Sequence, residues 1–317
     1  MFFLWKYIIF MIGDSMNKIV LVGCGNVGMA YAYALLNQGV GVNELVLVDI
    51  NKDKVEGEAM DLNHCLAYSP ARVLVRAGDY ADCKGARIVV LCAGAKQEVG
   101  ETRMDLIHKN SKIFKDIVGK VMDSGFDGIF VVATNPLDVM TYLTLKYSGM
   151  APNKVLGSGT TLDTARLRYM ISEKVGICPK DIDAYVIGEH GDSEFVPWSN
   201  ANIALKSIKC FLSKEEREEI EHDVRNSAYE IINRKGATAY GIGMCLARIT
   251  AAILEDKNII LSVSSYDKDH NICISTPAIV NKQGVKEKIR IPLDEEETKR
   301  IKNSMKVIKD AIDSVEK

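Results

Sequence analysis

The chain has 317 residues, about twice the usual domain length, which predicts two domains or one large α/β unit. Hydrophobic residues make up 47% of the sequence and charged residues 26%, proportions typical of a globular protein with a sizeable core. Its 40 Lys and Arg residues against 42 Asp and Glu residues give a net charge of -2, which argues against nucleic acid or an anionic membrane as the main partner.

The N-terminal segment, residues 1–16, differs from the rest of the chain. Its apolar run MFFLWKYIIFMIG is too short to span a bilayer as a helix and lacks the basic start and the cleavage site of a signal peptide. We expect a disordered or non-native extension, with a membrane anchor as the less favoured alternative. Without a targeting segment the expected location is the cytoplasm. The eight cysteines form no Cys-x-x-Cys pair and are expected to be reduced, with no metal bound.

Residues 17–157 alternate short apolar strands with helical segments. The predicted strands are Lys18–Val22, Glu44–Asp49, Arg72–Arg76, Arg87–Ala93 and Gly128–Thr134, and the helical or amphipathic segments are Asn26–Gln38, Lys52–Cys65 and Arg103–Ser124. This alternation predicts a Rossmann-type, doubly wound parallel sheet with helices on both faces. We expect this region to be a dinucleotide-binding domain.

Residues 158–317 have a different pattern, which predicts a second, α+β domain for substrate binding and catalysis. Helices are expected at Thr160–Val175, Ser213–Arg234, Thr238–Glu255 and in the amphipathic C-terminal segment, and strands at Asp183–Ile187, Ile259–Tyr266, Ile272–Val280 and Val285–Ile291. The last three strands alternate with polar turns and are predicted to form an antiparallel meander.

A glycine-rich turn follows the first predicted strand and opens the first helix. It reads Gly23-Cys24-Gly25-Asn26-Val27-Gly28, a G-x-G-x-x-G pattern in the context that favours dinucleotide binding. The glycines permit a tight turn and close approach of the backbone to a pyrophosphate at the helix N-terminus. Asp49, at the end of the second strand, can accept hydrogen bonds from a ribose and repel a 2′-phosphate, so NAD is the expected cofactor.

Two short stretches of the second half carry groups suited to acid–base chemistry. Leu162-Asp163-Thr164-Ala165-Arg166 lies on a predicted helix, and Gly188-Glu189-His190-Gly191-Asp192 forms a glycine turn after a strand. An isolated loop histidine is most often structural. Beside a dinucleotide fold and an Asp/Arg pair, His190 is instead a candidate general acid and base.

These motifs together resemble the L-lactate/malate dehydrogenase superfamily, and within it the bacterial L-lactate dehydrogenases. The resemblance runs from about Lys18 to the C-terminal helix and includes Gly100-Glu101-Thr102-Arg103, Thr134-Asn135-Pro136 and Gly236-Ala237-Thr238. It implies a Rossmann-type domain followed by an α+β substrate domain, and a homotetramer.

The resemblance also implies roles for single residues. Arg166 would bind the substrate carboxylate through its planar guanidinium, His190 would exchange a proton with the substrate oxygen, and Asp163 would hold the imidazole ring and favour its charged form. The other implied contacts are Arg103 on the carbonyl, Asn135 and Thr238 around the substrate, and Gly94, Ala95, Thr134 and Asn135 on the cofactor.

Gln97 indicates which substrate is used. At this loop position malate dehydrogenases carry an arginine for the second carboxylate, whereas lactate dehydrogenases carry a glutamine. A neutral Gln97 leaves the distal carboxylate of oxaloacetate unpaired, at a cost on the order of several kcal/mol, so pyruvate and L-lactate are the expected substrates. A malate or broad-specificity 2-hydroxy-acid dehydrogenase is the alternative, and an NAD-binding scaffold without turnover is a less favoured one.

One departure from the bacterial enzymes concerns their activation by fructose 1,6-bisphosphate. Arg168 matches the arginine of that effector site, but Asp183 stands where a histidine is expected. A carboxylate there repels phosphate groups, so we expect weak or absent activation by this effector.

Overall fold

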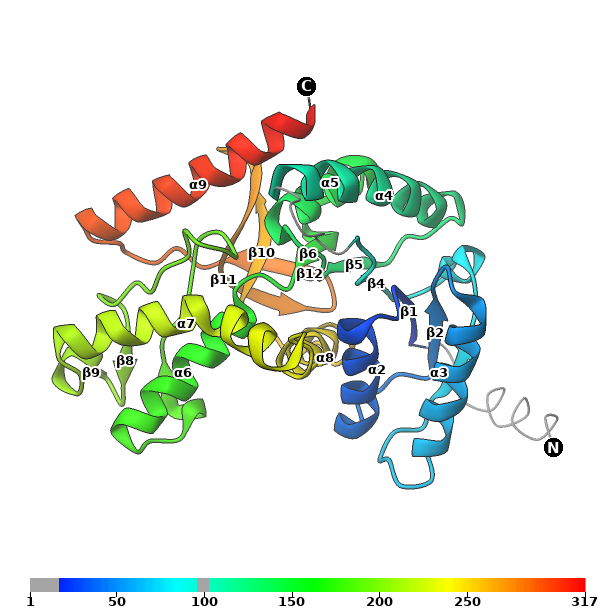
Figure 1. Cartoon of the computed structure of the whole chain (residues 1–317), viewed down its shortest axis with the longest axis horizontal. Coiled ribbons are helices and arrows are strands. Elements are labelled where there is room, and N and C mark those ends of the chain that lie inside the picture. The colour runs from blue at the N-terminus through cyan, green and yellow to red at the C-terminus, as the bar shows by residue number, and fades with distance from the viewer. Residues whose placement is uncertain (1–16, 96–102, 317) are drawn as a thin grey trace.

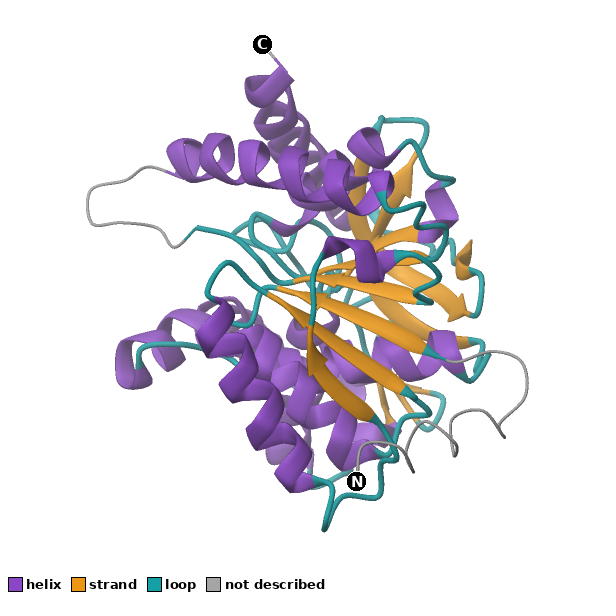
Figure 2. Cartoon of the chain, turned by 90° about the vertical axis from the view of Figure 1, so that its right-hand side faces the viewer, coloured by secondary structure: helices purple, strands orange, loops and turns teal. Residues whose placement is uncertain are grey.

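The computed structural model describes residues 17–95 and 103–316, so the N-terminal extension and Gln97 lie outside the described residues. The largest element is a nine-stranded sheet with the order β12-β11-β10-β6-β5-β4-β1-β2-β3. Helices cover both of its faces, and the three layers are seen nearly edge-on in Figure 2. The predicted α/β fold class is therefore confirmed.

Six parallel strands form the part of the sheet that belongs to the first half of the chain. They are β1 (Lys18–Val22), β2 (Glu44–Val48), β3 (Leu74–Ala77), β4 (Ile88–Leu91), β5 (Ile129–Val132) and β6 (Val155–Gly157). Most of their side chains are buried, because helices lie against both faces, and this explains their nearly continuous Val, Ile and Leu content.

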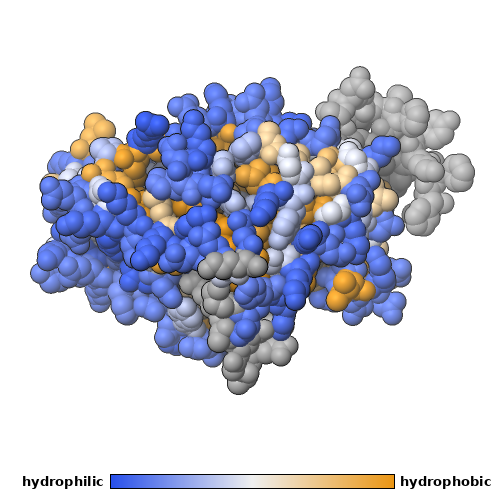
Figure 3. Space-filling model, turned by 90° about the horizontal axis from the view of Figure 1, so that it is seen from above, coloured by the Kyte–Doolittle hydropathy of each residue, from blue (hydrophilic) through white to orange (hydrophobic). Residues whose placement is uncertain are grey.

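Two hydrophobic cores separate the sheet from its helices. One face packs against α2 (Asn26–Gln38), α3 (Lys52–Cys65) and α8 (Tyr240–Leu254). The other face packs against α4 (Arg103–Asp123), α5 (Leu137–Ser148) and α9 (Glu295–Glu316), three helices that lie together in Figure 1. Figure 3 shows the molecule from the side on which α4, α5 and α9 lie, where hydrophilic side chains cover most of the surface and apolar ones lie between them.

The antiparallel meander of the second half extends this same sheet. Its strands are β10 (Ile259–Asp267), β11 (Ile272–Asn281) and β12 (Gly284–Lys288), and β10 pairs with β6 where Ser264 lies opposite Gly157. A Cβ at Gly157 would lie 3.1 Å from Cβ of Ser264 and 2.3 Å from the hydroxyl of Thr141, so a glycine permits this close packing. Strands from both halves of the sequence therefore share one sheet.

A smaller layer lies beside the sheet and has its own apolar core. It contains α6 (Thr161–Val175), α7 (Lys214–Lys235) and a three-stranded sheet of β7 (Ile182–Asp183), β8 (Asn202–Ile203) and β9 (Lys206–Ser207). The predicted strand Asp183–Ile187 was wrong over most of its length. Ile187 makes only an isolated bridge, to Phe195, because the chain turns there into the loop that carries His190.

Within residues 17–95 and 103–316, no helix has the length and apolar character that crossing a membrane requires.

Candidate active site

Helix α6 holds two of the predicted site residues one turn apart. It begins directly after the carboxyl end of β6, the edge of an open α/β sheet where ligands bind. The hydroxyl of Thr160 donates to the Val186 carbonyl (2.6 Å), and the Val186 N–H donates to the hydroxyl of Thr164 (3.0 Å). These bonds fix the start of α6 against the segment that leads to His190.

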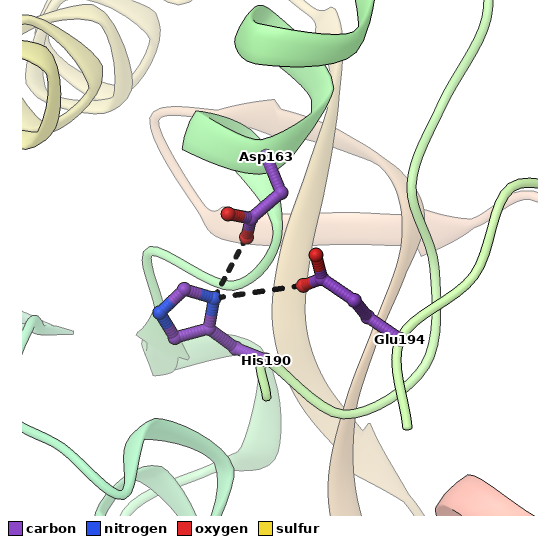
Figure 4. Close-up of side chains that lie close together, drawn as sticks. All are labelled: Asp163, His190 and Glu194. Carbon is purple, nitrogen blue, oxygen red and sulfur yellow. Dashed lines mark hydrogen bonds and ion pairs between the residues drawn. The ribbon is translucent and has the colours of Figure 1, made fainter. Parts of the chain in front are cut away.

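The structure brings Asp163, Arg166 and His190 into one hydrogen-bonded group, the acid–base site. Nδ1 of His190 lies 2.7 Å from one carboxylate oxygen of Asp163, and Nη1 of Arg166 donates to the other at 2.8 Å. The Asp163 side chain is 2% exposed, whereas a quarter of the His190 side chain (25%) is exposed. Figure 4 shows the ring of His190 turned toward the carboxylate of Asp163. The imidazole therefore has Nδ1 fixed by Asp163, and among the described residues no hydrogen bond is made to Nε2.

Charges at the acid–base site favour the protonated imidazole. Burial alone lowers the pKa of His190, but the charge and hydrogen bond of Asp163 outweigh burial and raise that pKa to about 9. Burial acts against the carboxylate of Asp163, and the charges of His190 and Arg166 outweigh it, so the pKa of Asp163 is lowered. The group is thus an ion pair in the free protein near neutral pH.

Two residues that the sequence analysis did not single out accept hydrogen bonds from the main chain of the loop that carries His190. The main-chain N–H of His190 donates to the buried carboxylate of Asp138 on α5 (2.8 Å), and the N–H of Glu189 donates to the hydroxyl of Ser304 on α9 (3.2 Å). Gly188 adopts φ +102, and a Cβ there would lie 2.6 Å from the Ser304 hydroxyl. The loop conformation consequently depends on helices from distant parts of the sequence.

The glycine-rich turn, together with Asp49, forms what we term the cofactor cradle. A Cβ at Gly28 would lie 2.1 Å from the Gly23 carbonyl, and Gly23 has φ +100, so neither position accepts a side chain without strain. Gly25 is the N-cap of α2, and nothing lies within 4 Å of a Cβ built there. Open space over a helix N-terminus fits the pyrophosphate of a dinucleotide.

Asp49, directly after β2, is the acidic residue of the cofactor cradle. Its carboxylate accepts the N–H of Cys24 (2.7 Å), which ties the glycine turn to the second strand. The adjacent Ile50 side chain is 97% exposed and offers an apolar surface beside the carboxylate. A negative charge next to an apolar surface suits the ribose and base of an adenosine without a 2′-phosphate.

The segments that follow β4 and β5 carry four of the predicted cofactor contacts and are bonded to each other. The hydroxyl of Thr134 donates to the Ala93 carbonyl (2.7 Å), and a Cβ at Gly94 would lie 2.6 Å from a methyl carbon of Thr134. Asn110, from α4, accepts the N–H of Ala95 (2.8 Å) and donates to the Asn135 carbonyl (2.9 Å). Asn110 therefore links both strand ends.

Comparison with protein families matches both halves of the chain. Residues 17–157 match the model described as lactate/malate dehydrogenase, NAD binding domain, and residues 160–317 match its alpha/beta C-terminal domain. The chain belongs to the lactate/malate dehydrogenase family. Its NAD-binding half contains the whole cofactor cradle, and its C-terminal half contains Asp163, Arg166 and His190.

Individual relatives agree with this assignment. An L-lactate dehydrogenase from Geobacillus sp. (strain WCH70) is 50% identical over 309 residues, 94% of this chain and 97% of that protein. L-lactate dehydrogenase 2 from Bacillus anthracis is 48% identical over 308 residues, 94% and 98% of the two chains.

Solved structures of lactate dehydrogenases are also similar to the structure of this chain. The lactate dehydrogenase MGS-M5 from a Medee basin deep-sea metagenome library has a TM-score of 0.93 at 48% identity and covers 96% of this chain and 100% of its own. The minor L-lactate dehydrogenase of Enterococcus mundtii in its ligands-bound form has a TM-score of 0.92 at 43% identity and covers 95% and 99%.

Several residues that family resemblance assigns to the site take no part in the described contacts around His190. Gln97 lies outside the described residues, and Arg103 begins α4 with a side chain that is not among those described. Thr238 is half-buried just before α8. The first turn of α8 reaches α6 through Gly241, where a Cβ would lie 2.7 Å from Leu162. The roles of these three side chains remain predictions.

Asp163, His190 and Glu194 form a cluster of potential metal ligands, with ligand atoms within 4.8 Å of one another. The 2.7 Å between His190 and Asp163 is a hydrogen-bond distance, and Arg166 already occupies the other oxygen of Asp163. A guanidinium at this position opposes a second cation. The arrangement therefore suits proton exchange, and the prediction that no metal is bound is retained.

Proposed function

We propose that the chain is an L-lactate dehydrogenase that interconverts pyruvate and L-lactate with NAD. The observation that carries this proposal is the buried Asp163 carboxylate, which holds the His190 ring with one oxygen and Arg166 with the other. Support comes from the cofactor cradle and from relatives that bear the name L-lactate dehydrogenase at 48% and 50% identity.

Arg166 is proposed to bind the carboxylate of the substrate. Nη1 of Arg166 contacts Asp163, and although the side chain is mostly buried, 11% of it is exposed to the site. A bidentate hydrogen-bonded contact between a guanidinium and a carboxylate fixes both the position and the orientation of a 2-keto acid.

His190 is proposed to move the proton. Because Nδ1 bonds to Asp163, Nε2 is the nitrogen that donates to the pyruvate carbonyl oxygen, or accepts the hydroxyl proton of lactate in the reverse direction. NADH, when bound, supplies the hydride to the carbonyl carbon. Hydride and proton together convert the ketone to the alcohol, and Asp163 stabilises the imidazolium before the proton leaves.

Specificity for pyruvate is proposed to rest on Gln97, with Arg103, Asn135 and Thr238 as further substrate contacts. A glutamine offers no charge to the second carboxylate of oxaloacetate. The test is NADH oxidation by the purified protein with pyruvate and with oxaloacetate at matched subsaturating concentrations. A higher kcat/KM for pyruvate is expected. A preference for oxaloacetate would identify a malate dehydrogenase, and no turnover with either keto acid would favour a scaffold.

The assembled form is proposed to be a homotetramer in the cytoplasm. Exposed apolar side chains gather around a groove between α2 and α8, where Tyr33 is 53%, Met244 53% and Tyr240 76% exposed. Such a patch favours contact with another copy of the chain. All eight cysteines lie in the described residues as free thiols, as expected in a reducing compartment. Light scattering coupled to size-exclusion chromatography tests the oligomeric state.

A further inference from the structure

Glu194 places a second buried carboxyl group at the acid–base site. The residue is 5% exposed, and one of its carboxyl oxygens lies 4.0 Å from Nδ1 of His190. Figure 4 shows the side chains of Glu194 and Asp163 converging on the same ring nitrogen from two different segments. Ligand atoms of all three residues lie within 4.8 Å of one another. Two carboxylates this close and this buried repel each other strongly if both are ionised.

The two carboxyl groups differ in the donors they receive. Asp163 accepts from the charged groups of Arg166 and His190. Among the hydrogen bonds of the described residues, none is donated to the carboxyl of Glu194, whose main-chain N–H and carbonyl bond instead to Gly191 and Arg225. Asp163 is therefore the ionised member of the pair, and a proton is most stable on Glu194.

The two cations of the acid–base site, His190 and Arg166, bond to Asp163 and not to Glu194. Among the described residues, the other nearby cations bond to different groups or are exposed, although Nε of Arg225 is buried without a hydrogen-bond partner. Arg225 on α7 reaches the Glu194 carbonyl at 3.3 Å and the carboxylate of Glu221 at 3.2 Å, and Arg300 on α9 also pairs with Glu221. Exposed charges that line the same cavity as Glu194 are Asp192, Glu296 and Lys299. Asp138 on α5, behind the loop, bonds to the main chain of His190. Burial, followed by the charge of Asp163, raises the pKa of Glu194 well above its ordinary value, although the charges of His190, Arg166 and Arg225 act in the opposite direction.

We propose that Glu194 is a positioning residue that holds a proton beside the Asp163–His190 pair while the enzyme works. This rests on the proposed function, in which Arg166 binds the substrate carboxylate. With a neutral Glu194, the charges of Asp163, His190, Arg166 and the bound substrate sum to zero. Loss of the Glu194 proton at alkaline pH adds an unbalanced negative charge, which repels the substrate carboxylate and holds the proton on His190 more tightly.

The direct test is a titration of the free protein, labelled with ¹³C at the glutamate carboxyls, by NMR. The resonance that disappears in Glu194→Gln belongs to Glu194. We expect this carboxyl to remain protonated at neutral pH. Glu296→Gln, which removes an exposed carboxyl that lines the same cavity, is the control and should leave the Glu194 resonance in place. In Asp163→Asn the Glu194 titration should move to lower pH. Titration of Glu194 in the ordinary acid range would overturn the proposal, whether or not pyruvate is a substrate.

A kinetic test reports on the consequence for substrate binding. In the wild-type protein, KM for pyruvate should rise at alkaline pH through loss of two protons, those of His190 and Glu194. In Glu194→Gln only His190 titrates, so the rise should be less steep, while Glu296→Gln should follow the wild type. Equal slopes in wild type and Glu194→Gln would contradict the proposal. Failure of the wild type to reduce pyruvate would instead count against the proposed function and leave the NMR result to decide the state of Glu194.

Discussion

The cofactor cradle is shaped by main-chain atoms, whereas the acid–base site is shaped by buried charges. In the cradle, the backbone of Gly28 packs directly against the carbonyl of Gly23, and the N–H of Gly23 and the carboxylate of Asp49 tie the turn to the end of β2. In the acid–base site, Asp163 joins two charged side chains while main-chain bonds only hold the loop in place. Changes in the first region should affect cofactor binding, and changes in the second should affect turnover.

The largest effect is expected for His190→Gln. Glutamine keeps a polar group in the loop but cannot donate and accept the transferred proton, so kcat for pyruvate should fall by roughly 10²- to 10⁴-fold. The Kd for NADH, measured by fluorescence titration, should change little because the cradle is untouched. Equal losses in turnover and NADH affinity would mean that His190 is structural and would remove the distinction between the two regions.

Asp163→Asn should give the next largest effect. Without the carboxylate charge, the pKa of His190 should fall from about 9 toward its ordinary value of about 6.5. Pyruvate reduction needs protonated His190. The pH at which kcat/KM declines should therefore decrease by as much as the pKa of His190 does. A pH profile measured against the wild type checks this. An unmoved decline would show that another group controls the titration.

Gly28→Ala tests the cradle. Its Cβ would lie 2.1 Å from the Gly23 carbonyl, so the turn must shift, at a cost of about 1–3 kcal/mol. NADH affinity and thermal stability should both decrease, while the pH at which kcat/KM declines should stay where it is. Gly119→Ala on α4, where nothing lies within 4 Å of the added Cβ, is the control outside the cradle and should leave NADH affinity unchanged. Unchanged NADH affinity in Gly28→Ala would contradict the assignment of the cradle.

Asp49→Ala should have the smallest effect and the most selective one. Removing the carboxylate relieves repulsion of a 2′-phosphate, so the ratio of kcat/KM with NADH to that with NADPH should decrease. The N–H of Cys24 also loses its acceptor, which predicts a modest loss of thermal stability. If the cofactor ratio stayed constant, Asp49 would be a structural partner of Cys24 and not a ribose contact.

The two regions also differ in how far the sequence alone predicts them. The cradle is encoded in adjacent residues, so Gly23, Gly25, Gly28 and the strand-end Asp49 could be found from their spacing. Asp163, Arg166 and His190 were found through family motifs. Glu194 was missed although it lies four residues from His190, because its burial beside Asp163 depends on the fold. Asp138 and Ser304 were missed because their partners are distant in sequence. Ser304, for example, bonds to the hydroxyl of a residue 111 positions away.

Two features of the fold were missed for physical reasons. Helix α5 was not predicted because its residues from Leu137 to Thr144 are all buried, which removes the polar face that reveals a surface helix. The pairing of the meander with β6 was not predicted because antiparallel strands give no sequence signal for the strand beside them. Only the contact of Ser264 with Gly157 places β10 next to β6.

The most direct test of the account is the pH dependence of kcat/KM in both directions of the reaction. If Asp163 raises the pKa of His190 to about 9, pyruvate reduction should decline as pH rises through about 9, and lactate oxidation should increase over the same interval. A titration with opposite signs in the two directions, beside the loss of substrate affinity expected when Glu194 loses its proton, would support His190 as the acid and base. Profiles that share no titration, or that change in the same direction, would contradict it.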